Sequence, residues 1–136
     1  MIEYVVGFLH DANCVVLIEK KRPEWQFGLL NGVGGHIEDG ETPSDAMRRE
    51  FHEEAGLDID YWNLGVVLTG KGWRVHFFSA RGPAMYARTQ TDERVHYVSI
   101  SSLPGNVIPN LRWLIPLCLC AGVKKPIEME EKINGR

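Results

Sequence analysis

The sequence predicts an α/β fold in which a mixed β-sheet lies between helices. Three observations support this. Apolar segments of strand length occur both early and late in the chain, a well-delimited helix lies between them, and a second helical pattern follows near the end. This order of strands and helices favours a sheet covered by helices. The five segments expected to be strands are 2–10, 14–20, 64–69, 73–80 and 95–100.

The first two strands are expected to form an antiparallel hairpin, because only Asp11-Ala12-Asn13 separates them. The stretch from residue 21 to residue 35 has a different character. It combines Pro23 with the aromatic side chains of Trp25 and Phe27 and with four glycines. Glycine and proline interrupt regular structure, so we expect a loop here. Loops often carry binding residues, and this one is a candidate for ligand contact.

The helix at 43–55 has clear start and stop signals. Thr42 can cap its first turn and Pro43 suits the first helical position. Gly56 ends the helix, because glycine readily adopts the left-handed conformation of a helix end. Helical periodicity places the buried stripe on Met47, Phe51 and Ala55.

The rest of the chain completes one domain, which we place at residues 1–123. The strands at 64–69 and 73–80 flank Gly70-Lys71-Gly72, and the strand at 95–100 follows. A second helix is expected within 109–121, where Pro116 can distort it. The polar and charged residues 124–136 are expected to form a tail or a short surface helix.

Composition excludes several classes of protein. With 136 residues, 44% of them apolar and 24% charged, the chain is expected to be a soluble globular domain. A net charge of -3 argues against binding of long nucleic acid. Three scattered cysteines and the absence of a signal-like N-terminus favour a cytoplasmic protein with reduced thiols. No membrane partner is expected, and a homodimer is compatible with these observations.

The most informative segment spans residues 35–57. It contains fixed glycines, an arginine, glutamates and apolar positions at set spacing: Gly35, Glu41, Arg49, Glu50, Phe51, Glu53, Glu54, Gly56 and Leu57. Helical geometry groups Glu50, Glu53 and Glu54 on one patch. Hard oxygen donors grouped in this way suit Mg²⁺ or Mn²⁺, which keep waters and substrate phosphates as further ligands.

Other readings of the acidic patch are weaker. A lone cluster of glutamates is usually a solvated helix face, but here the flanking pattern favours a metal site. A calcium loop of the EF-hand type needs acidic residues that alternate through a 12-residue loop, which is absent from the sequence. A zinc site is not indicated, because the histidines are scattered along the sequence. Arg49 can orient a neighbouring carboxylate, although a surface ion pair is the alternative.

This segment resembles the signature box of the Nudix hydrolase superfamily, over 23 of 136 residues. The one departure is Phe51, where the family more often has an aliphatic residue. The resemblance implies a Nudix-like α/β/α sandwich and metal-dependent hydrolysis of a nucleoside diphosphate-linked substrate by water attack on phosphorus. It further implies a small nucleotide as the binding partner.

The resemblance also assigns candidate roles. Glu50, Glu53 and Glu54 would bind the metal ion, with the Gly35 carbonyl as a further ligand, and Arg49 would orient Glu50. Either Glu53 or Glu54 would be the general base. Glu93 occupies the place of a further catalytic carboxylate that some members have outside the box, and a turn residue is the alternative.

The substrate is expected to depend on residues outside the box. The sequence Asn31-Gly32-Val33-Gly34-Gly35 is similar to that of the oxidised-purine nucleoside triphosphate pyrophosphohydrolases, in which the Asn contacts the base. Four aromatic residues are further candidates for substrate binding: Phe27, Trp73, Tyr97 and Trp113.

The expected reaction is cleavage of a nucleoside triphosphate, normal or oxidised, to monophosphate and pyrophosphate. A second enzymatic hypothesis is hydrolysis of ADP-ribose, of another nucleoside diphosphate sugar or of a dinucleoside polyphosphate. A non-enzymatic hypothesis is a nucleotide-binding sensor module without turnover. Hydrolysis of RNA caps or ends is a further enzymatic hypothesis.

Overall fold

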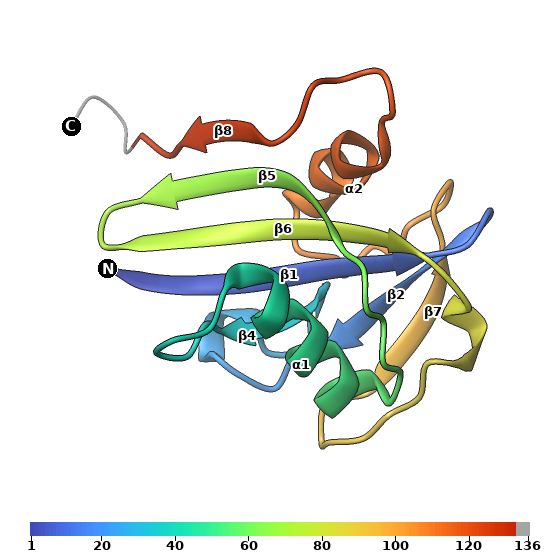
Figure 1. The fold of residues 1–136 in the computed structure, drawn as a ribbon. Helices are drawn as coiled ribbons and strands as arrows, with labels where there is room; N and C mark the ends of the chain where they lie inside the picture. The colour runs from blue at the N-terminus through green and yellow to red at the C-terminus, as the bar shows by residue number, and fades with distance from the viewer. Residues whose placement is uncertain (133–136) are drawn as a thin grey trace.

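The computed structural model describes residues 1–132, and in it a mixed eight-stranded sheet lies between two α-helices (Figure 1). Helix α1 (Pro43–Ala55) packs on one face and helix α2 (Leu111–Leu119) on the other. The predicted α/β class, with a mixed sheet between helices, is therefore confirmed. Two short 3-10 helices, η1 (Glu24–Gln26) and η2 (Ala84–Tyr86), lie in the connections.

The strands follow the predicted segments closely where the apolar pattern was clear. The strands are β1 (Ile2–His10), β2 (Cys14–Glu19), β3 (Leu30–Asn31), β4 (Val33–His36), β5 (Asn63–Gly70), β6 (Trp73–Arg81), β7 (Val95–Ser99) and β8 (Ile127–Glu130). Strands β3, β4 and β8 are the three that the sequence pattern did not predict.

Strand β1 is the centre of the sheet and forks away from its hairpin partner. One edge of β1 pairs in parallel with β6 along its whole length. On the other edge, the end of β1 pairs with β2, whereas its first half pairs with β4. Residues 30–36 thus cross from β2 to β1, because β3 pairs with β2 and β4 with β1. This crossing places Gly35 directly beside Val5.

Two expectations for local structure were wrong. Residues 30–36 are not part of an irregular loop, because β3 pairs with β2 and β4 pairs with β1. The glycine-rich sequence does not reveal these distant backbone partners. The expected tail or short helix at 124–136 is instead a strand at Ile127–Glu130, paired in parallel with β5. Ile127 and Met129 alternate inward onto the α2-side core, and the rest of the expected tail, residues 133–136, lies outside the described part of the chain.

Two apolar cores hold the layers together. The core under α1 contains the predicted stripe of Met47, Phe51 and Ala55, all fully buried. Phe51 lies against Trp62 with ring centroids 5.2 Å apart, so the aromatic residue that departs from the family pattern has a packing partner in this chain. The second core lies between the sheet and α2.

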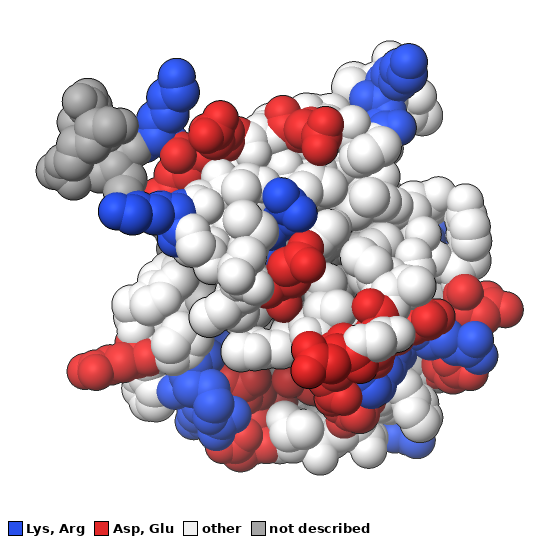
Figure 2. Space-filling model, turned by 60° about the vertical axis from the view of Figure 1, so that its left-hand side comes forward, with Lys and Arg blue, Asp and Glu red and all other residues white. Residues whose placement is uncertain are grey.

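No helix within residues 1–132 is long and apolar enough to span a membrane. Figure 2 shows one face of the molecule, where acidic side chains gather and the Lys and Arg side chains are separated from one another. The described residues on this face form no continuous basic strip.

Candidate active site

Helix α1 presents the glutamates because both of its ends are fixed locally. The Thr42 hydroxyl accepts a hydrogen bond from the Asp45 amide at 3.1 Å, which caps the first turn. At the other end Gly56 has φ +77°, and its amide donates to the His52 carbonyl. The three metal-ligand candidates, Glu50, Glu53 and Glu54, therefore lie in the last two turns of a helix whose bounds agree with the prediction.

Gly35 allows α1 to approach β4 closely. A Cβ atom at position 35 would lie 2.6 Å from the carboxyl atoms of Glu50, a distance that side-chain atoms do not tolerate. The structure thus brings together Gly35 and Glu50, which the sequence analysis placed in one metal site. Only a residue without a side chain leaves the Glu50 carboxylate in this position.

Arg49 is the hub of the acidic cluster. Its Nε and Nη2 donate to the two oxygens of Glu41 at 2.6 and 2.8 Å, which is a bidentate pair. Its Nη1 donates to Glu50 at 2.8 Å and to Glu53 at 3.3 Å. The guanidinium also donates to the His36 carbonyl, so it ties the loop before the helix to the helix and to β4.

The charges of this hub stabilise one another. The hydrogen bonds from Arg49 lower the pKa of Glu41 to about 2, and the same contacts raise the pKa of Arg49 above its ordinary value. Glu41 is consequently ionised at any physiological pH and holds Arg49 in place. The Arg49 side chain is only 24% exposed, which argues against the alternative of a loose surface ion pair.

Glu54 is the least satisfied carboxylate of the cluster. Its Oε2 is buried and has no hydrogen-bond partner within the described residues. Burial raises the pKa of Glu54 to about 7, which Lys20 partly offsets and the carboxylates of Glu50 and Glu93 reinforce. Burial likewise raises the pKa of Glu50, although Arg49 opposes this effect. A cation would relieve both penalties.

Glu93 lies close enough to influence Glu54, but its own oxygens are engaged. It is 2% exposed, and Oε1 accepts from Lys20 Nζ at 3.2 Å. Oε2 accepts from the Lys21 amide at 2.7 Å and from the Arg22 amide at 3.4 Å. We interpret Glu93 as a positioning residue for Lys20 and for the start of the loop between β2 and β3. The sequence reading missed Lys20, whose only signal is its place at the end of a strand.

The carboxylates fit a divalent cation, although they do not form a finished cage. No group of three or more His, Cys, Asp or Glu side chains in residues 1–132 surrounds a common point. Glu50 and Glu53 each accept a hydrogen bond from the Arg49 guanidinium. An unpartnered buried oxygen on Glu54 and hard oxygen donors on one helix face are nevertheless what Mg²⁺ or Mn²⁺ binds.

Asn31 lies at the end of β3 with its amide held in one orientation. Its Oδ1 accepts from the Gly32 amide at 2.8 Å, and its Nδ2 donates to Gln26 at 3.3 Å. One N–H and one lone pair are left for a ligand. The sequence analysis did not identify Gln26, because its hydrogen bond to Asn31 depends on the conformation of the loop between them.

The aromatic candidates do not all gather at one place. Phe27 is 64% exposed in the loop before β3. Trp113 is 44% exposed in the first turn of α2, and the chain before α2 runs beside β3, where the Ile108 amide donates to the Leu30 carbonyl. Trp73 instead covers Gly70 at the β5–β6 turn. Tyr97 donates to Asp11 in the β1–β2 turn.

Comparisons with known proteins agree with this geometry. The sequence model described as the NUDIX domain matches residues 3–116. An oxidized purine nucleoside triphosphate hydrolase of Mus musculus is 28% identical over 111 residues, which cover 76% of this chain and 71% of that protein. An 8-oxo-dGTP diphosphatase of Escherichia coli is 31% identical over 64 residues, which cover 46% of this chain and 50% of that protein.

The fold is also similar to solved structures. A MutT NUDIX hydrolase from Burkholderia pseudomallei superposes with a TM-score of 0.73 at 18% identity, over 85% of this chain and 95% of that one. At this identity the likeness concerns the fold alone.

Replacing Gly35 with alanine is expected to weaken Mn²⁺ binding at least about tenfold, because the added Cβ displaces the Glu50 carboxylate. Calorimetric titration of Mn²⁺ into the metal-free protein measures the effect. Gly105→Ala is the matched control, since a Cβ there meets nothing within 4 Å. Equal Mn²⁺ affinity of the two variants would contradict the assignment of Glu50 to the metal site.

Glu54→Gln is expected to change how stability depends on pH. In the folded, metal-free protein the pKa is about 7 against an ordinary 4.5, so the native state holds this proton where the unfolded chain has lost it. The associated stability is complete below about pH 4.5 and is lost as the pH rises through about 7, by up to about 3 kcal/mol.

Urea unfolding at pH 5 and pH 8 therefore should show a smaller loss of stability for Glu54→Gln than for the unmodified protein. Glu53→Gln is the control, because that side chain is on the same helix and 56% exposed. The same pH dependence in all three proteins would rule out the burial effect at Glu54.

Proposed function

Because the chain belongs to the NUDIX domain family, we propose that it is a metal-dependent pyrophosphohydrolase that cleaves a purine nucleoside triphosphate to the monophosphate and pyrophosphate. The family match establishes a Nudix pyrophosphohydrolase, and the triphosphate substrate is the proposal. An oxidised purine is the favoured base.

The observation that carries the proposal is the arrangement around Arg49. This residue holds Glu50 and Glu53 on the same patch as a buried, unpartnered Glu54 oxygen. A module that only bound nucleotides would gain nothing from three crowded carboxylates, two of them destabilised by burial. The choice of an oxidised purine is supported by the mouse oxidized purine nucleoside triphosphate hydrolase and the bacterial 8-oxo-dGTP diphosphatase that the chain resembles, and by the amide at Asn31.

Glu50, Glu53 and Glu54 would hold the divalent cation, with the Gly35 carbonyl as a further oxygen. When bound, Mg²⁺ or Mn²⁺ supplies positive charge that stabilises phosphate oxygens and makes water easier to deprotonate. Arg49 keeps the Glu50 carboxylate in one orientation through its 2.8 Å hydrogen bond. Glu41 acts through Arg49 and is a positioning residue.

Glu54 is our candidate for the general base. Water attacks phosphorus, the bond from that phosphorus to the bridging oxygen breaks, and the water proton passes to a carboxylate oxygen. The Oε2 atom of Glu54 has no competing partner among the described residues, whereas Glu53 already accepts from Arg49. Lys20, held by Glu93, places a positive charge near Glu54 and keeps part of its population ionised at neutral pH.

Recognition of the base is assigned to Asn31. Its amide keeps one donor and one acceptor free, and a purine edge presents both kinds of group. Phe27 and Trp113 are the favoured aromatic candidates, because both are exposed, Phe27 precedes β3 in the chain, and the segment before α2 hydrogen-bonds to β3 at Leu30. Trp73 and Tyr97 have other partners, which makes them weaker candidates for stacking.

Glu54→Gln is expected to lower kcat with Mg²⁺ and 8-oxo-dGTP at least about a hundredfold, because the amide neither accepts the proton nor carries the charge that binds metal. Glu53→Gln is expected to lose activity through the metal alone. Phosphorus NMR of the products identifies pyrophosphate and monophosphate directly.

The control is Glu128→Gln, an exposed residue of β8. Near-normal turnover in both the Glu53 and Glu54 variants would refute the hydrolytic mechanism. Release of products from ADP-ribose or a dinucleoside polyphosphate, without turnover of any triphosphate, would refute the proposed substrate and leave the family assignment intact.

Asn31→Ala is expected to reduce discrimination between 8-oxo-dGTP and dGTP by about tenfold or more in kcat/KM, since a lost pair of hydrogen bonds to a base costs about 1–3 kcal/mol. Activity on inosine or pyrimidine triphosphates serves as the internal reference. An unchanged ratio would remove Asn31 from base recognition without affecting the metal site.

A further inference from the structure

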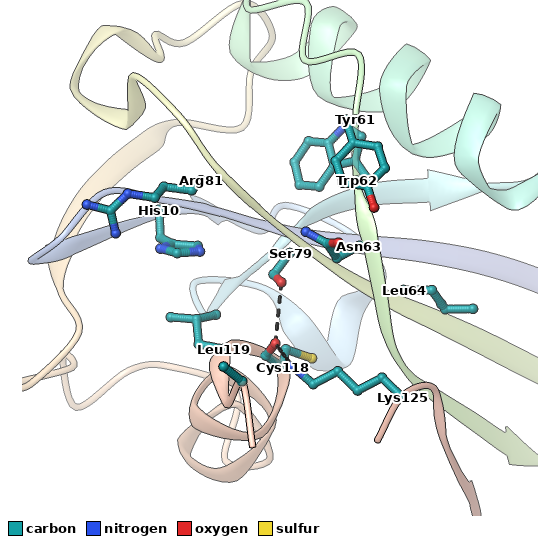
Figure 3. Close-up of a pocket in the computed structure, with 11 residues that line it drawn as sticks. His10, Tyr61, Trp62, Asn63, Leu64, Ser79, Arg81, Cys118, Leu119 and Lys125 are labelled. Carbon is teal, nitrogen blue, oxygen red and sulfur yellow. Dashed lines mark hydrogen bonds between the residues drawn. The ribbon is translucent and has the colours of Figure 1, made fainter. Parts of the chain in front are cut away.

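A cavity of about 540 Å³ lies where the parallel strands β1 and β6 end together (Figure 3). Figure 3 shows His10 and Arg81 at one side of it, Asn63 and Ser79 in the middle, and Lys125 at the other side. None of the α1 glutamates lines this cavity. It is therefore separate from the candidate active site, and the proposed function does not use it.

The charged side chains that line the cavity, Arg81 and Lys125, are basic. His10, Arg81 and Lys125 contribute to its walls, and no carboxylate does. Arg81 is exposed and forms no salt bridge with another residue in the part of the chain that the structure describes. Asp11 lies near Arg81 and is ionised, because hydrogen bonds from Tyr97 and from the Asn13 and Cys14 amides lower its pKa to about 2, but its side chain is not part of the cavity wall.

The carboxyl end of α2 also lies here, and its negative dipole end would repel an anion. The structure offsets this effect. The Cys118 carbonyl accepts from Lys125 Nζ at 2.5 Å and from the Ser79 hydroxyl at 3.4 Å. The Cys118 carbonyl near the end of the helix is thus occupied by donors. Within residues 1–132 the side chains of Arg81 and Asn63 form no hydrogen bond with another residue, so their polar groups are open to a ligand.

The remaining wall is aromatic and aliphatic, with Tyr61, Leu64 and Leu119 among its residues. Tyr61 is 70% exposed, so its ring is available for stacking. The volume falls within the range typical of small-molecule sites. A basic end and an apolar wall match a molecule that carries both an anionic group and an organic body.

We propose that this cavity binds a small phosphate-bearing organic molecule of about the size of a nucleoside monophosphate. The phosphate lies toward His10 and Arg81, and the organic part lies against Tyr61. Binding needs no divalent cation, in contrast to the proposed chemistry on α1.

The test is a titration of the full chain in metal-free buffer with AMP, inorganic phosphate and adenosine in turn, followed by amide chemical shifts. AMP is expected to give saturable shifts at Asn63, Ser79 and Arg81 but not at Gly35 or Glu50. Inorganic phosphate is expected to bind the same amides more weakly, and adenosine is expected to give no saturable shifts.

The matched pair of variants is Arg81→Gln and Arg88→Gln, both exposed arginines that lose one charge. Arg81→Gln is expected to weaken AMP binding at least fivefold, whereas Arg88→Gln leaves it unchanged. Adenosine binding as tight as AMP, saturable shifts confined to residues outside the cavity, equal weakening in both variants, or no saturable shift at all would each overturn the proposal.

Discussion

The Arg49 guanidinium is the interaction on which the rest of the site depends. Four acidic side chains and one backbone carbonyl converge on it, from the loop before α1, from α1 itself and from β4. Without this cation the glutamates of one helix face would repel one another, and the loop at 37–42 would lose its anchor. A single residue therefore sets both the shape and the charge of the acidic patch.

The carboxylates of the acidic patch differ in how well the fold stabilises their charge. Glu41 is fully committed to Arg49, and its lowered pKa shows how strongly the pair is stabilised. Glu54 is the opposite case, because burial raises its pKa and one of its oxygens has no partner among the described residues. The folded chain thus places unfavourable electrostatics at the buried carboxylates of Glu54 and Glu50, as active sites commonly do.

Local signals made much of this predictable. Thr42, Pro43 and Gly56 determine α1 through hydrogen bonds within a few residues, so its bounds were predicted correctly. The fork of the sheet and β8 depend on partners far along the chain, which neither composition nor periodicity reveals. The same holds within the site: Lys20 and Gln26 take their roles from Glu93 and Asn31, and such pairings exist only after folding.

The crossing of residues 30–36 between β2 and β1 has a consequence for substrate length. Asn31 and Gly35 belong to one extended backbone segment whose two ends are clamped by different strands. Pairing with β2 at Asn31 and with β1 at Gly35 fixes the position of each end of the segment. The segment thus fixes the separation between the Asn31 amide at one end and the carboxylate patch beside Gly35 at the other. A molecule that engages both ends is selected by its length as well as by its chemistry.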